Sequence, residues 1–193
     1  EYLEPITVKD QQYVRTIVPQ ETMIKGVITG PYTLAKSCSN SFYKNEQQLA
    51  YAFADVLKQE TQRLQPHVDM ISIDEPYYVN EMPHYGKDLI NTITKNITCP
   101  VMLHICGDIS SILPEILEIP VDILSHEFKA LPHLLDAFKQ YSFPQNICLG
   151  SVRSDNPTVE SVEEITTHIQ QAITIFDNKL IHLAPDCGQR LLP

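Results

Sequence analysis

Short apolar runs alternate along this chain with longer stretches in which apolar residues recur every three or four positions. The first pattern is typical of buried β-strands, and the second of helices that pack on one face. In residues 45–65, for example, Leu49 and Phe53 recur at helical spacing, and Asn45 is a suitable N-cap. The pattern therefore predicts strands and helices in alternation.

The alternation continues through most of the chain. Strands are predicted over residues 23–29, 68–74, 100–106, 121–125, 146–152 and 180–184. Helices are predicted over residues 45–65, 86–96, 109–117, 130–140 and 160–176. Asp108 and Ser161 are suitable N-caps for two of these helices, and Ile6-Thr7-Val8 is a possible short strand ahead of Pro19.

This order of elements favours an α/β fold with a parallel sheet, because strands joined by helices are parallel neighbours. No Gly-x-Gly-x-x-Gly follows a strand, so a dinucleotide-binding sheet has no support. Units of about 30 residues instead match a (β/α)8 TIM barrel, in which the carboxyl ends of the strands form the active site. Six such units make three quarters of a barrel, so we predict a single partial barrel domain over residues 1–193.

The residues able to do chemistry lie at these strand ends. In a strand, alternate side chains share a face, so His104 and Cys106 project together. Glu127 and Cys187 follow two later strands. Two thiolates, one imidazole and one carboxylate make a tetrahedral zinc set. Each of these residues alone is more often an ordinary core or surface residue, and the remaining cysteines and histidines are interpreted that way. His126, next to Glu127, either supports a metal ligand or lies at the surface.

Composition narrows the function classes. The chain has 43% hydrophobic and 20% charged residues and a formal net charge of −10. The acidic balance argues against nucleic acid as a partner, and no apolar run approaches the length of a membrane span. Five cysteines without a compact framework favour a reducing cytoplasm over secretion. Because the chain does not start with Met and ends at Leu191-Leu192-Pro193, we expect a fragment of a longer protein.

Several stretches together resemble the zinc-containing, cobalamin-independent methionine synthase family, especially its short archaeal form. The matching stretches are Thr29-Gly30-Pro31-Tyr32-Thr33-Leu34, Ile73-Asp74-Glu75-Pro76, His104-Ile105-Cys106-Gly107-Asp108, Ile123-Leu124-Ser125-His126-Glu127-Phe128, Val159-Glu160-Ser161-Val162-Glu163-Glu164 and Pro185-Asp186-Cys187-Gly188. They occur in the family's order and spacing and extend over nearly the whole chain.

The resemblance implies a zinc-dependent methyltransferase that forms methionine from homocysteine. The zinc would be held by His104, Cys106, Glu127 and Cys187. Asp74 would bind the amino group of the substrate, and Glu75 either shares that group or shapes the turn. The resemblance also implies that this chain spans about the third to the eighth barrel strand, with the first one or two βα units missing.

The methyl donor is a further expectation. The long, folate-dependent forms carry an Asp-Ile-His segment after the seventh strand, whose His is linked to proton handling. Here that region reads Val152-Arg153-Ser154-Asp155-Asn156. The missing His favours methylcobalamin or a methylated corrinoid protein over a methyl-folate as donor. No catalytic acid or base is assigned, although Asp155 is a candidate.

Two other functions compete with this one. A methylcorrinoid:coenzyme M-type thiol methyltransferase shares the barrel, the His-x-Cys pair and a late cysteine, whereas Asp74-Glu75-Pro76 and Glu127 favour homocysteine. A degenerate, non-catalytic zinc-binding module that docks to a corrinoid protein is the alternative outside the enzymes. Turnover by the parent protein separates it from a methyltransferase.

Overall fold

The computed structural model describes residues 2–190 and residue 192. Its strands are β1 (Lys25–Thr29), β2 (Met70–Asp74), β3 (Val101–His104), β4 (Ile123–His126), β5 (Asn146–Val152) and β6 (Leu180–Pro185). Its α-helices are α1 (Val8–Ile17), α2 (Pro31–Ser37), α3 (Glu46–Leu64), α4 (Gly86–Thr94), α5 (Leu113–Leu117), α6 (His133–Phe138) and α7 (Val162–Phe176). Within this described part, no helix combines the length and the apolar character needed to cross a membrane.

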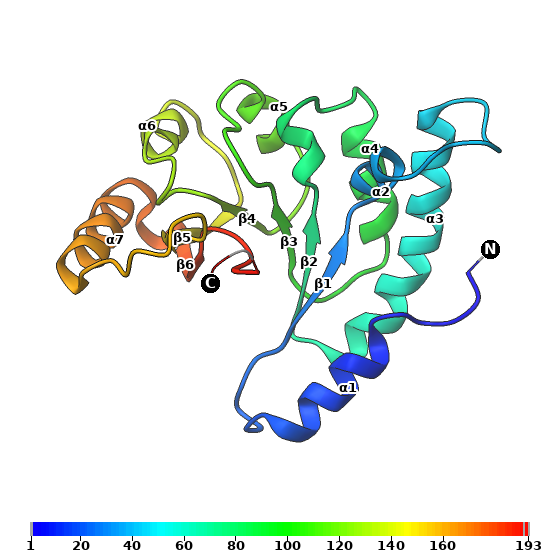
Figure 1. Cartoon of the computed structure of the whole chain (residues 1–193), viewed down its shortest axis with the longest axis horizontal. Helices are drawn as coiled ribbons and strands as arrows, with labels where there is room; N and C mark the ends of the chain where they lie inside the picture. The colour runs from blue at the N-terminus through cyan, green and yellow to red at the C-terminus, as the bar shows by residue number, and fades with distance from the viewer. Residues whose placement is uncertain (1, 191, 193) are drawn as a thin grey trace.

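The strands form one sheet in the order β1-β2-β3-β4-β5-β6, and every neighbouring pair is parallel. Consecutive parallel neighbours need a crossover in the same direction each time, and right-handed crossovers then put the helices on one face. Figure 1 shows this arrangement, with the helices from α3 to α7 in an arc outside the strands. The predicted α/β fold of the barrel type is confirmed.

The two faces of the sheet bury different residues. The face toward the helices is the main apolar core and includes Ile28, Ile73, Leu103, Leu124 and Leu149. The opposite, concave face carries a separate small cluster of Met70, Met102, Ile123 and Cys148, against which Ala184 packs. This second cluster fills the amino-terminal part of the concave face. The polar residues near the carboxyl ends of the strands therefore lie next to an apolar layer.

Local sequence signals explain where the two longest helices begin. The Asn45 side chain accepts a hydrogen bond from the Gln48 N–H and caps α3. Ser161 and Glu164 form a reciprocal capping box at the start of α7. Both caps satisfy N–H groups that have no partner within their helix, and both predicted starts are confirmed.

Two sequence predictions about local structure are wrong, and one helix was not predicted. Residues 6–8 do not form a strand; Val8 instead begins helix α1. Asp108 does not cap a helix at residue 109, because its side chain bonds the backbone of Ser110 and the ring of His133, and α5 begins only at Leu113. The short helix α2 was not foreseen.

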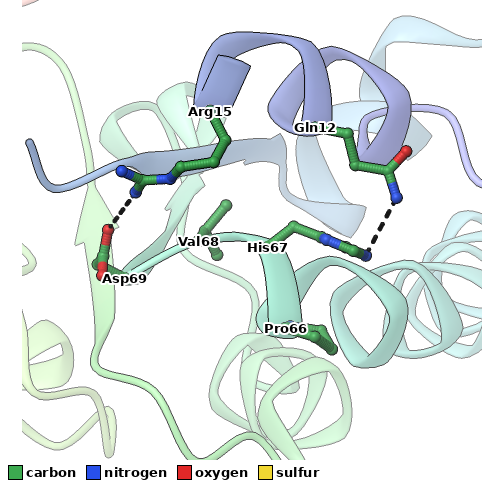
Figure 2. A pocket seen from close by; sticks show the side chains of 6 residues that line it. All are labelled: Gln12, Arg15, Pro66, His67, Val68 and Asp69. Atoms are coloured by element: carbon green, nitrogen blue, oxygen red, sulfur yellow. Dashed lines mark hydrogen bonds and ion pairs between the residues drawn. The ribbon is translucent and has the colours of Figure 1, made fainter. Parts of the chain in front are cut away.

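The N-terminal segment is attached to the barrel by polar contacts at two places. Buried Glu60 accepts hydrogen bonds from the backbone N–H groups of Ile6 and Thr7, and from two hydroxyl groups of the same segment. Figure 2 shows the second place, where Arg15 of α1 pairs with Asp69 at 3.1 Å beside a cavity of about 360 Å³. These contacts place α1 against the amino ends of β1 and β2, far from the carboxyl ends.

We expect Glu60→Gln to lower the free energy of unfolding by about 1–3 kcal/mol. The NH2 group of the glutamine would face N–H and O–H donors that now bond a carboxylate oxygen. Urea denaturation measures this loss, and hydrogen exchange at Ile6 and Thr7 should become faster. Burial raises the pKa of Glu60, but the bonds from Thr7, Tyr2 and Ile6 outweigh it and lower the pKa below 4.5. The stabilisation is therefore present above pH 4.5 and is lost as the pH falls through the lowered pKa.

Asp55→Asn is the matched control, since Asp55 is an exposed carboxylate on the same helix. Its effect should stay within about 0.5 kcal/mol. Equal losses from the two variants would contradict the anchoring role of Glu60.

Candidate metal centre

The strand register brings three polar residues side by side on the concave face. Asp74 of β2 is the register partner of His104 of β3, and His104 is the partner of Ser125 of β4. Partners in register have side chains on the same face of a sheet. The carboxyl ends of β2, β3 and β4 therefore present a carboxylate, an imidazole and a hydroxyl in one row.

His104 is held in a defined orientation. Its Nδ1 lies 3.1 Å from the Ser125 Oγ, and its Nε2 lies 3.2 Å from the Cys106 Sγ. With the Nδ1 hydrogen donated to Ser125, the Nε2 lone pair is free to bind a metal. The predicted convergence of His104 and Cys106 is confirmed, although β3 ends at His104 and Cys106 lies just beyond it.

Cys187 completes a group of three donors. Its Sγ lies 3.0 Å from the Cys106 Sγ, although the two residues are 81 positions apart. One donor atom from each of His104, Cys106 and Cys187 falls within a mutual distance of 4.8 Å. Neighbouring sulfurs in a tetrahedral zinc site lie about 3.8 Å apart, as Zn–S bonds of about 2.3 Å require. A slight outward shift of the thiols would fit this donor set to zinc.

The electrostatics of the group favour one thiolate. Hydrogen bonds from Cys106 and His104 lower the pKa of Cys187. The neighbouring Cys187 and burial raise the pKa of the Cys106 thiol. Burial opposes a charge on His104, but its contact with Cys187 and the charge of Asp74 outweigh this and raise its pKa. A positive ion at this point would stabilise both thiolates.

Glu127 does not join this group of three donor atoms. Its Oε2 accepts a hydrogen bond of 2.7 Å from the N–H of Gly107, the residue after Cys106. It is still close enough to raise the pKa of both Cys106 and His104 by its charge. The structure therefore brings Glu127 beside the donors, and its role as a fourth ligand stays a prediction.

Asp74 lines the cavity next to the donors. This cavity, of about 510 Å³, lies on the concave face and is also lined by Lys25, Thr29, His104, Cys106 and Cys187. Burial raises the pKa of Asp74, while His104, the Ser72 hydroxyl and Lys25 oppose the rise. Asp74, which is expected to bind an amino group, and the three donor residues thus face one space large enough for a small amino acid.

Glu75 is placed differently from its neighbour. It is fully buried, and its carboxylate accepts hydrogen bonds from the N–H groups of Tyr32 and Thr33 and from the Thr33 hydroxyl. Burial raises its pKa to about 7 against these bonds. A Cβ at Gly30 would lie 2.2 Å from the carboxyl carbon, so only glycine fits there. Glu75 caps α2, and the geometry does not support it as a substrate contact.

Two other candidates also lie outside the cavity lining. Asp155 is exposed and forms a bidentate pair with Arg153, at 2.7 and 2.6 Å. His126 is fully buried, and its Nδ1 bonds the Ile105 carbonyl. Burial lowers its pKa to about 3, so the ring is neutral. Neither residue is positioned to move a proton at the cavity.

Ser125 and Gly107 contribute to the site although the sequence assigned them no role. Ser125 orients His104, and Gly107 has a φ of 86° and offers its N–H to Glu127. Positive φ favours glycine. The position of Ser125, two residues after Ile123 on the same strand face, is the signal that could have found it.

Curated relatives match over most or all of the chain. Methionine synthase of Methanocaldococcus jannaschii is 35% identical over the whole chain, which spans 68% of that protein. Methionine synthase of Saccharolobus solfataricus is 31% identical over the whole chain, which spans 59% of that protein. The chain is thus shorter than both relatives.

Solved structures agree on the fold. A B12-independent methionine synthase from Shewanella sp. W3-18-1, in complex with selenomethionine, superposes with a TM-score of 0.82 at 23% identity, over 99% of this chain and 62% of that one. A methyltransferase from Methanosarcina mazei gives a TM-score of 0.75 at 18% identity, over 97% and 59% of the two chains. Residues 1–192 also match the family described as "Cobalamin-independent synthase, Catalytic domain". The chain therefore belongs to the family of cobalamin-independent synthase catalytic domains.

Proposed function

We propose that this chain carries the zinc-binding and thiol-binding part of a methyltransferase that converts homocysteine to methionine. The observation that carries the proposal is the convergence of His104, Cys106 and Cys187 beside Asp74 in one cavity. The membership of the family and the names of its archaeal relatives support the same activity. Glu127 is the proposed fourth ligand, because its carboxylate lies next to the donors.

The donor set suits activation of a thiol. A free thiol has a pKa near 8.5 and is mostly protonated at neutral pH, whereas the thiolate is the nucleophile. A zinc ion held by His104, Cys106 and Cys187, with the Glu127 carboxylate giving way to the substrate sulfur as the fourth ligand, would supply the positive charge that favours the thiolate form of the substrate. The thiolate then forms a bond to the methyl carbon while the bond between that carbon and its carrier breaks.

Asp74 is proposed to bind the ammonium group of homocysteine. Its partly buried carboxylate, hydrogen-bonded by the Ser72 hydroxyl at 2.9 Å, is a fixed negative charge beside the thiol site. Coenzyme M has no amino group to pair with this charge, so the position of Asp74 favours homocysteine over a thiol of that type. Zinc is the proposed cofactor, and a methylated corrinoid is the proposed donor because residues 152–156 contain no histidine.

We expect the parent protein, loaded with zinc, to form methionine from homocysteine and methylcobalamin. Methionine is measured by mass spectrometry, with methyltetrahydrofolate as the alternative donor and coenzyme M as the alternative thiol. Turnover with the folate alone would overturn the choice of donor. Methylation of coenzyme M in preference to homocysteine would overturn the choice of acceptor, and no turnover of either thiol would refute the enzyme assignment.

Exchange of Cys187 for Ser should reduce the zinc content at least severalfold, because a hydroxyl replaces a thiolate ligand. Zinc per chain is measured by mass spectrometry after dialysis against a weak chelator. Cys38→Ser serves as the control, since Cys38 is exposed and free, and should leave the zinc content unchanged. An unaltered zinc content in Cys187→Ser would remove Cys187 from the ligand set.

Asp74→Asn should raise the KM for homocysteine by about 10- to 100-fold, as the loss of a charged hydrogen bond of about 1.5–3 kcal/mol requires. Zinc content should stay at the wild-type level. Steady-state kinetics provide the measurement, and Asp88→Asn, at an exposed position on α4, is the control. A wild-type KM in Asp74→Asn would rule out the ammonium contact.

A further inference from the structure

Asp186 is a buried carboxylate beside the metal group and outside the proposed ligand set. Its side chain is 1% exposed. Its Oδ1 accepts a hydrogen bond of 2.9 Å from the N–H of Lys129, and its Oδ2 accepts one of 2.7 Å from the N–H of Ala130. A buried carboxylate is costly unless its oxygens are bonded. These two bonds therefore fix the backbone of residues 129–130 against the start of the C-terminal segment.

The two segments that Asp186 joins each carry a proposed ligand. Asp186 directly precedes Cys187, whereas Lys129 and Ala130 follow Glu127 by two and three residues. The hydrogen bonds cross 57 and 56 positions of sequence. One side chain thus sets the distance between the end of β6 and the turn after β4.

Beyond the end of β6, few contacts hold the segment that carries Cys187. Among residues 181–190, Asp186 is the one buried residue, and Gln189 and Arg190 are exposed. A Cβ at Gly188 would meet nothing within 4 Å. Figure 1 shows the C-terminal segment, in red, leaving β6 at the edge of the sheet. Residues up to Pro185 are held by the pairing of β6 with β5. Beyond them, the Asp186 N–H bonds the Val152 carbonyl at 2.9 Å, Cys187 contacts Cys106, and the Asp186 carboxylate bonds the backbone of residues 129 and 130.

Gly150 of β5 provides the room for this contact. A Cβ there would lie 2.0 Å from the Asp186 Oδ1 and 2.6 Å from the His126 carbonyl oxygen. The φ of Gly150 is not positive, so the conformation of the backbone does not require a glycine. The close approach of the Asp186 carboxylate does require one.

We propose that Asp186 is a positioning residue that holds the Cys187 sulfur in place for the metal. This inference rests on the proposed function, because it assumes that Cys187 binds zinc. It assigns Asp186 an effect on metal affinity and on the geometry of the bound metal. An anchor of the backbone alone would affect only the free energy of unfolding.

The test compares the wild-type parent protein with Asp186→Asn. In this variant an NH2 group, which donates hydrogen bonds, replaces one of the carboxylate oxygens that accept them. We expect zinc affinity, measured by competition with a chromogenic chelator, to fall by about 10- to 100-fold, as for other residues that orient metal ligands. The visible absorption of the Co²⁺-substituted variant should also change. Gly150→Ala, whose Cβ would crowd both the Asp186 carboxylate and the His126 carbonyl, should lower the zinc affinity in the same direction.

Glu60→Gln is the control, because Glu60 is also a buried carboxylate that holds backbone N–H groups, at the other end of the molecule. It should lower stability without changing the Co²⁺ spectrum or zinc affinity. Wild-type affinity and an unchanged spectrum in Asp186→Asn would overturn the inference and leave the proposed function intact. Failure of the wild-type protein to bind zinc or Co²⁺ would overturn both.

Discussion

The in-register parallel pairing of β2, β3 and β4 is the constraint on which the site depends. Parallel strands in consecutive order have all their carboxyl ends at one edge, so residues far apart in sequence meet without any long loop. Asp74, His104 and Ser125 are neighbours for this reason alone. A shift of one residue in any pair would turn the affected side chain toward the helices, where the core is apolar.

Buried carboxylates fix the positions of segments outside the strands, as the strand register fixes the positions of residues within the sheet. Glu60, Glu75 and Asp186 each bond backbone N–H groups of a segment distant in sequence. Their pKa values differ because burial raises the pKa of a carboxyl group and hydrogen bonds to the carboxylate lower it. Several donors lower the pKa of Glu60, whereas burial prevails at Glu75, with a pKa of about 7, and at Asp186, with a pKa of about 6. Polar anchors of this kind fix loops that have too few apolar side chains to pack.

The sequence predicted what depends on local chemistry. Short apolar runs indicated the strands, and the capping residues Asn45 and Ser161 indicated where two helices begin. His104, Cys106 and Cys187 could be found because imidazole and thiol groups at strand ends are rare and chemically distinctive. The sequence left two roles open for Glu75, because adjacent acidic residues look alike in a sequence. In the structure Asp74 faces the cavity, whereas Glu75 points toward α2. The three residues Ile6–Val8 resemble a strand locally, whereas in the structure Ile6 and Thr7 bond Glu60 from outside the sheet and Val8 begins α1.

The concave face divides into two parts with different degrees of closure. The donors His104, Cys106 and Cys187 come from segments at the ends of β3 and β6, and the space between these strands is filled below by Met102, Ile123 and Cys148. Toward β1 the same face is open, since Val27 is 43% exposed there. The arrangement of the donors is therefore determined by packed elements, whereas the neighbouring space beside Asp74 and Lys25 is bounded on one side only. The proposed metal binding and the proposed recognition of an amino acid should accordingly respond to different substitutions, because the first depends on the contacts of β3 to β6 and the second on the open part of the concave face beside β1.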